Sequence, residues 1–138
     1  IWPEEMRWSK SPILTLIGKD DDYTPAVLIE ELSPAINENG GDSKIILYED
    51  SHHSFDSIDP VIFVPNAIAV GQRHTFVDKG GSHYHKDEDG KKTMMNEPHE
   101  REKLFKDRAK IGAHLGCNWK ARKSSMEDSV HFLLDNIS

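Results

Sequence analysis

Two loops of this sequence carry side chains that could do acid–base chemistry. The acidic loop, residues 18–25, holds three consecutive aspartates, and the histidine loop, residues 49–56, holds His52 and His53. A carboxylate that accepts the Nδ1 hydrogen of a histidine fixes the tautomer and stabilises the imidazolium, so the other ring nitrogen can act as a general base near neutral pH. Acidic turns and surface histidines are also common without such a role. On the residues alone, both interpretations stay open.

The segments that precede these loops predict two buried parallel strands. Residues 13–17 form a nearly continuous apolar run rich in branched side chains that ends at Gly18, and residues 44–48 form a second run of this kind. Such runs are typical of strands covered on both faces, which usually belong to parallel sheets. Because parallel strands end at the same edge of a sheet, we expect the acidic loop and the histidine loop to lie side by side there.

A helix is expected between the two strands. Thr24 and Pro25 offer a cap and a first helical residue, and Gly40-Gly41 offers a stop. Pro34 should break or kink this helix. The residues that recur at helical spacing are Leu28, Leu32, Ala35 and Ile36. The unit is therefore a strand, a right-handed crossover helix and a parallel strand.

The middle of the chain has far fewer apolar residues than the first half. Residues 71–110 are too polar to bury much surface, which predicts a polar insertion or a partly disordered loop within a single partial domain, residues 1–138. Residues 97–113 are compatible with a helix.

A closing amphipathic helix is predicted near the end of the sequence. Ser124 and Glu127 have the spacing of a capping box, which predicts the start of this helix. Its apolar stripe is Met126, Val130, Leu133, Leu134 and Ile137.

The two loops and the strands before them resemble the α/β-hydrolase fold, and specifically the dienelactone hydrolase family. The matching segments are residues 12–18, 21–26 and 53–56, together with Tyr48. The resemblance implies that Asp21 is the catalytic acid and that His53, which begins a His-Ser-Phe tripeptide, is the catalytic histidine. It makes His52 the less favoured base, and it implies no metal and no organic cofactor.

The same resemblance implies a part that these 138 residues do not contain. In α/β-hydrolases the nucleophile lies upstream of the acid, on a Gly-x-Ser-x-Gly or Gly-x-Cys-x-Gly elbow, and neither motif occurs in the sequence. We therefore expect the C-terminal portion of an α/β-hydrolase, inactive alone, whose missing N-terminal part carries the nucleophile. The whole enzyme would hydrolyse a small ester, lactone or thioester. The alternative is a non-catalytic binding or assembly module with a hydrolase-like fold.

Composition excludes several other classes. The formal net charge of −7 argues against sequence-independent nucleic-acid binding, and no apolar run approaches the roughly 20 residues that span a bilayer. The single cysteine, Cys117, excludes an intrachain disulfide and fits either a cytoplasmic or a periplasmic protein. It follows the histidine loop and lacks an elbow, so we expect a structural thiol. The opening residues do not resemble a signal peptide, and we expect a processed or truncated chain.

Two further expectations concern surfaces. His83 and His85, beside the acidic residues Asp87 to Asp89, could attract a divalent metal, but a single such pair is a weak signal and solvation is the expected state. If the strand at residues 13–17 lacks a neighbour on one edge, copies of the chain should associate by pairing through it.

Overall fold

The computed structural model describes residues 2–5, 8–69, 74–86 and 89–137. The N-terminal Ile1 lies outside the described residues, as do Asp87 and Glu88 of the acidic run beside His83 and His85. Within the described part of the chain, none of the helices is both long and apolar enough to span a bilayer. The described residues contain both helices and strands, so the predicted mixed α/β class is confirmed.

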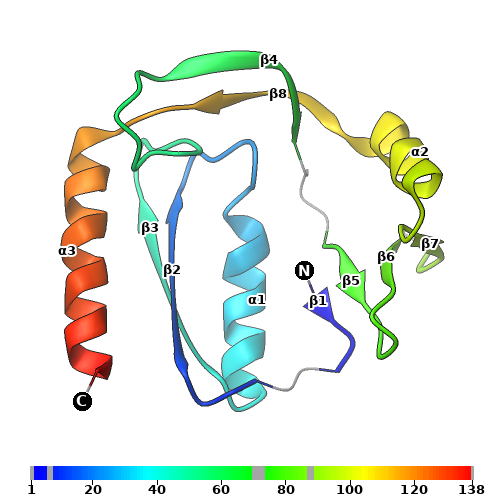
Figure 1. Ribbon diagram of the computed structural model, residues 1–138, viewed down its shortest axis with the longest axis horizontal. Helices are drawn as coiled ribbons and strands as arrows, with labels where there is room; N and C mark the ends of the chain where they lie inside the picture. The colour runs from blue at the N-terminus through cyan, green and yellow to red at the C-terminus, as the bar shows by residue number, and fades with distance from the viewer. Residues whose placement is uncertain (1, 6–7, 70–73, 87–88, 138) are drawn as a thin grey trace.

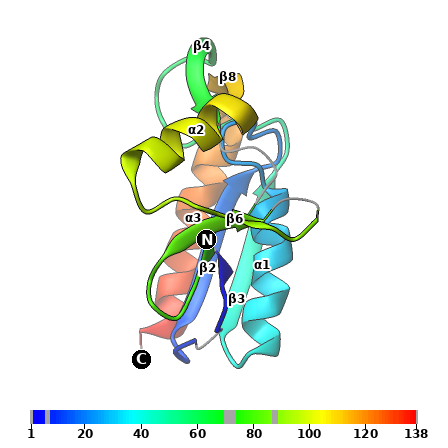
Figure 2. The same cartoon turned by 90° about the vertical axis from the view of Figure 1, so that its right-hand side faces the viewer.

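The centre of the fold is a strand, a helix and a strand. β2 (Pro12–Gly18) and β3 (Asp42–Tyr48) pair in parallel with an unbroken register from Pro12↔Asp42 to Gly18↔Tyr48, and α1 (Val27–Glu38) lies between them in the chain. Figures 1 and 2 show α1 and α3 (Trp119–Asn136) on opposite sides of this pair. The two strands therefore end at one edge, at the top of Figure 1.

The first helix differs in two details from the sequence-based prediction. It begins at Val27 after Ala26, and Thr24 does not cap it, because the Thr24 side chain is used by Asp21 instead. Pro34 lies inside α1 without ending it. Both Pro34 and Glu30, whose carbonyl loses its helical donor, are exposed, so water can take the place of the missing hydrogen bond.

The N-cap of the closing helix α3 lies six residues before the predicted cap, Ser124. Asn118 is the N-cap, and its side-chain oxygen accepts hydrogen bonds from the backbone N–H groups of Lys120 and Ala121, both at 3.1 Å. The buried side of α3 consists of the small residues Ala121 and Ser125. A small core joins Ala121 to Tyr48 and Phe55, with Leu16 and Ile46 packed against it.

The predicted apolar stripe does not form the packed side of α3. Its members are all at least half exposed, from 51% for Leu133 to 75% for Ile137. Tyr48 instead fixes the helix by donating a hydrogen bond from its hydroxyl to the Asp128 carboxylate at 2.6 Å. The apolar stripe of α3 is therefore free to pack against a further protein segment.

After the histidine loop the chain forms one strand of an antiparallel pair, and the second strand of the pair brings the chain back beside this loop. β4 (Ile62–Ala69) pairs with β8 (Lys110–Leu115), with a register shift between Val64 and Ile68, and the pair arches over the carboxyl ends of β2 and β3 (Figure 1). We call residues 62–115 the arm. The backbone at its base is held by the Cys117 N–H, which donates to the Asp59 carbonyl at 2.8 Å.

The middle of the arm has more structure than its polarity predicts. It contains β5 (Phe76–Val77), β6 (His83–Lys86), β7 (Lys92–Met94) and α2 (Pro98–Arg108), and β1 (Trp2–Pro3) joins the same small sheet in the order β1-β5-β6-β7. Tyr84 is fully buried against Phe76. That residues 71–110 are an insertion stays a prediction.

The helix considered for residues 97–113 is shorter than predicted. It ends at Arg108, and the chain continues as strand β8 from Lys110. Residues 110–115 form a strand because they pair with β4. Within β8, Gly112 takes a positive φ of 91°, and a side chain at this position would collide with Phe63.

Candidate active site

The end of β2 brings the acidic loop against the histidine loop. A Cβ atom at Gly18 would lie 2.2 Å from the carbonyl oxygen of Ser51, so only glycine permits this approach. The Asp20 N–H donates to the same Ser51 carbonyl at 3.0 Å, and Lys19 N–H donates to the Tyr48 carbonyl at 2.9 Å. The two loops are therefore joined by backbone hydrogen bonds.

Asp21 is held in one orientation by the turn that follows it. Its Oδ1 accepts the backbone N–H groups of Tyr23 at 2.9 Å and Thr24 at 2.7 Å, and its Oδ2 accepts the Thr24 hydroxyl at 2.8 Å. The side chain is only 5% exposed. Buried carboxylates need such partners, and this set fixes Oδ2 toward the histidine loop.

His53 faces that oxygen. Its Nδ1 lies 3.0 Å from Asp21 Oδ2 and 3.1 Å from Thr24 Oγ1. A carboxylate can only accept, so Nδ1 carries the hydrogen and the neutral ring keeps its lone pair on Nε2. Tyr23 packs against the ring with the centroids 4.8 Å apart. The geometry is that of a general base whose tautomer is set by an acid.

The histidine loop is itself locked on both sides of His53. Ser51 is fully buried, and Phe55 lies in the core against Tyr48. Ser54 has a positive φ of 58°, an uncommon conformation for a residue other than glycine. Asn118 donates its amide to the Asp50 carbonyl at 3.0 Å and its N–H to the Phe55 carbonyl, so the start of α3 also holds this loop.

A concave pocket opens beside the Asp21–His53 pair. It has a volume of about 650 Å³ and is bounded by the end of β2, the two loops and α3. Its lining includes the apolar side chains Leu16, Met126 and Val130. The pocket is large enough for a small organic ligand or for a protein segment.

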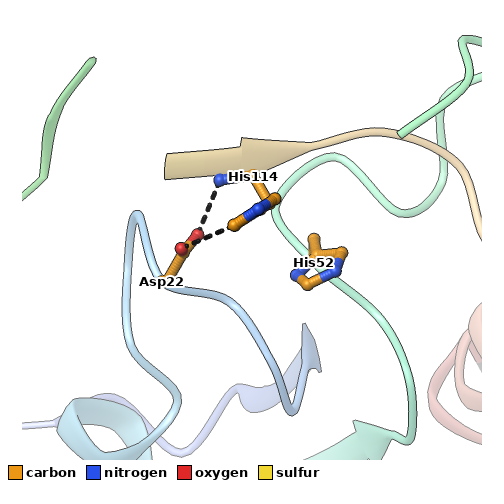
Figure 3. Close-up of side chains that lie close together, drawn as sticks. All are labelled: Asp22, His52 and His114. Carbon is orange, nitrogen blue, oxygen red and sulfur yellow. Dashed lines mark hydrogen bonds and ion pairs between the residues drawn. The ribbon is translucent and has the colours of Figure 1, made fainter. Parts of the chain in front are cut away.

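A second cluster lies next to this pair, on the side of the arm. Figure 3 shows Asp22, His52 and His114 directed toward one another. Asp22 Oδ2 lies 2.9 Å from His114 Nδ1, and Asp22 Oδ1 accepts the His114 backbone N–H at 2.8 Å. The rings of His52 and His114 stack with centroids 5.1 Å apart. The acidic loop thus contacts both the histidine loop and the arm.

The charge state of Asp22 follows from these contacts. Partial burial favours the neutral acid, but the hydrogen bonds from His114 and the charge of Lys110 outweigh it, so the pKa of Asp22 lies below its usual value. The carboxylate is therefore ionised at neutral pH and available as an acceptor or a ligand.

Sequence reasoning brought Asp21 and His53 together but missed His114. This histidine is far from Asp22 in the chain and directly follows residues 97–113, for which a helix was considered, so no spacing pattern linked the two residues. The other candidates lie elsewhere. Cys117 is a partly buried thiol, His83 is exposed and His85 is buried.

One comparison with known proteins identifies the family of this chain. The family model described as "Dienelactone hydrolase family" matches residues 3–95, which is more than half of the chain. The chain belongs to the dienelactone hydrolase family. No curated protein and no solved structure gave a significant match to it.

The dienelactone hydrolase match covers both loops. Asp21, His53 and the β2-α1-β3 unit all lie within it, whereas β8 with His114 and helix α3 lie beyond its end. The Asp–His pair therefore belongs to the part of the chain that is similar to the family, and the contact from His114 comes from outside that part.

Proposed function

We propose that this chain supplies the acid and the base of a carboxylic-ester hydrolase site of the dienelactone hydrolase type. The observation that carries the proposal is the contact between buried Asp21 and His53 Nδ1 at the carboxyl edge of β2 and β3. The proposed substrates are small esters, lactones or thioesters, attacked by a serine or cysteine that comes from outside these 138 residues.

In the proposed reaction, His53 Nε2 accepts the proton of the nucleophile as its oxygen or sulfur bonds to the substrate carbonyl carbon. The proton then passes to the leaving alcohol or thiol, and the C–O or C–S bond breaks to give an acyl-enzyme. Water then attacks the acyl carbon and gives a proton to Nε2, and Nε2 returns this proton to the nucleophile as its bond to the acyl carbon breaks, which releases the acid and restores the free enzyme. Throughout these steps the Asp21 carboxylate accepts the hydrogen bond from His53 Nδ1 and stabilises the imidazolium.

The proposed position of the nucleophile is the pocket beside His53. Asp21 and Thr24 contact the Nδ1 side of the imidazole, and the ring lines the pocket. A nucleophile elbow and an oxyanion hole could approach along this opening, against the apolar side chains of α3 that the described residues leave half exposed. The missing N-terminal part is accordingly the proposed partner of this surface.

The test compares the parent protein that contains the upstream part with variants at His53 and Asp21. Using p-nitrophenyl esters and thioesters, we expect His53→Ala to abolish hydrolysis and Asp21→Asn to lower kcat by about four orders of magnitude, through the wrong histidine tautomer. His131→Ala, on the exposed side of α3, is the matched control and should leave the rate unchanged.

Three results would count against parts of this proposal. Full activity in His53→Ala would overturn the assignment of the base. Hydrolysis by the 138-residue chain alone, lost in His53→Ala, would place the nucleophile within it. An inactive parent protein, with every substrate class tried, would favour the alternative of a binding or assembly module that keeps the hydrolase shape.

A further inference from the structure

The cluster of Asp22, His52 and His114 has the composition of a transition-metal site. One ligand atom of each residue lies within 4.8 Å of those of the other two, and this group is the one with three such donors in the part of the chain that the structure describes. Two imidazoles and one carboxylate suit Zn²⁺, Co²⁺ and Ni²⁺, whereas Mg²⁺ and Ca²⁺ prefer oxygen ligands.

The contact between Asp22 and His114 already has the separation of neighbouring metal ligands. Zinc bonds of roughly 2.0–2.2 Å at tetrahedral or octahedral angles place adjacent donors about 3 Å apart. Asp22 Oδ2 and His114 Nδ1 are 2.9 Å apart. The separation of these two atoms is therefore compatible with both being ligands of one ion.

His52 carries the accessory hydrogen bond that is typical of a metal ligand. Its Nδ1 lies 3.0 Å from the backbone carbonyl oxygen of Asp20. A carbonyl can only accept, so Nδ1 holds the hydrogen and Nε2 keeps the lone pair that binds metal. Ligating histidines usually make such a bond, which fixes both the tautomer and the orientation of the ring.

The surroundings permit binding. The side chains of Asp22 and His114 are 24% and 43% exposed, so an ion can reach them. Lys110 Nζ lies 3.7 Å from Asp22 Oδ2 and would oppose a cation, but its side chain is largely exposed and can turn toward water. The Asp22–His114 contact is already short, so binding requires a movement of the partly buried His52 side chain toward the other two ligands.

We propose that Asp22, His52 and His114 bind one divalent ion of the Zn²⁺ class, which fastens β8 of the arm to the acidic loop and the histidine loop. The ion would sit beside the Asp21–His53 pair and take no ligand from it. The proposal does not depend on the proposed hydrolase function, because it concerns different side chains.

To test this proposal, the 138-residue chain is first treated with a chelator. It is then titrated with Zn²⁺, followed by calorimetry, and separately with Co²⁺, followed by visible absorption. We expect one equivalent to bind, Co²⁺ to give ligand-field bands of nitrogen and oxygen coordination, and Zn²⁺ to raise the melting temperature. His52→Ala and His114→Gln should each weaken binding at least tenfold. His83→Ala, an exposed histidine of the arm, is the matched control and should bind normally.

Several outcomes would overturn the proposal. They are the absence of saturable binding, binding that His52→Ala and His114→Gln both leave intact, or binding that His83→Ala abolishes. His114→Gln keeps a polar side chain against Asp22, and His52→Ala removes only one ring stacking contact of a partly buried side chain, so a urea unfolding curve of each variant shows whether it still folds. His53→Ala should bind metal normally, which separates this proposal from the hydrolase.

Discussion

Replacing Gly18 by alanine should pull the acidic loop away from the histidine loop. The new Cβ would lie 2.2 Å from the Ser51 carbonyl oxygen and 2.9 Å from that of His52, both backbone atoms that no rotamer change can move. Normal contact requires a displacement of about 1 Å. The hydrogen bond from Asp20 N–H to the Ser51 carbonyl spans this contact and would be lost.

The expected cost follows from these two effects. Overpacking at a rigid contact costs roughly 1–3 kcal/mol, and one lost backbone hydrogen bond about 1 kcal/mol, so Gly18→Ala should lower the free energy of unfolding by roughly 2–4 kcal/mol. Urea unfolding of the 138-residue chain measures this value. The ring ¹⁵N shifts of His53 report in parallel whether Nδ1 still donates to Asp21.

A second glycine provides the control. A Cβ at Gly80 would meet only the Asp78 side chain at 3.3 Å, so Gly80→Ala should change stability by no more than about 0.5 kcal/mol. If Gly18→Ala proved as stable as the control and the His53 ring shifts stayed unchanged, the close approach of the two loops would not be what positions the pair.

Three further predictions concern the same part of the molecule. Thr24→Val removes the hydroxyl that Asp21 Oδ2 accepts, and should lower the free energy of unfolding by about 1.5–3 kcal/mol in urea, whereas Thr24→Ser should retain most of it. Because contacts with His114 lower the pKa of Asp22, this carboxylate stabilises the fold above its unfolded pKa near 3.9, and that contribution disappears as pH falls through the lower folded value. Urea midpoints measured from pH 6 to pH 2 should therefore drop less steeply for Asp22→Asn. Finally, β2 pairs with β3 on one edge and with no other strand among the described residues, so the isolated chain should self-associate, and an elution volume independent of concentration would contradict this.

The sequence predicted the centre of the fold because the signals there are local. A run such as residues 13–17 is apolar on both faces, and the crossover rule then fixes where both strands end. The topology alone predicted that the acidic loop and the histidine loop would meet, and the resemblance to the dienelactone hydrolase family singled out Asp21 and His53 within them. The exact contacts, such as the three hydrogen bonds that orient Asp21, depend on the turn that follows and were not predictable.

The outer parts depend on contacts between distant segments. Residues 110–115 are a strand because β4 supplies a partner, although the first four of them belong to the segment that was compatible with a helix. The start of α3 is set by Asn118, which is held by carbonyls of the histidine loop as well as by its own helix. Neither influence is visible in a short window of sequence, and the same holds for the contact between His114 and Asp22.

The narrow base of the arm has a consequence for how this protein can vary. The chain leaves at Asp59 and returns at Cys117 through neighbouring backbone atoms, so residues between them can be added or removed while the exit and re-entry points stay fixed. The entropy of closing a loop rises only slowly with its length. Shortened or exchanged versions of this segment should therefore fold on an unchanged scaffold, which makes it a replaceable module above the carboxyl edge of the sheet.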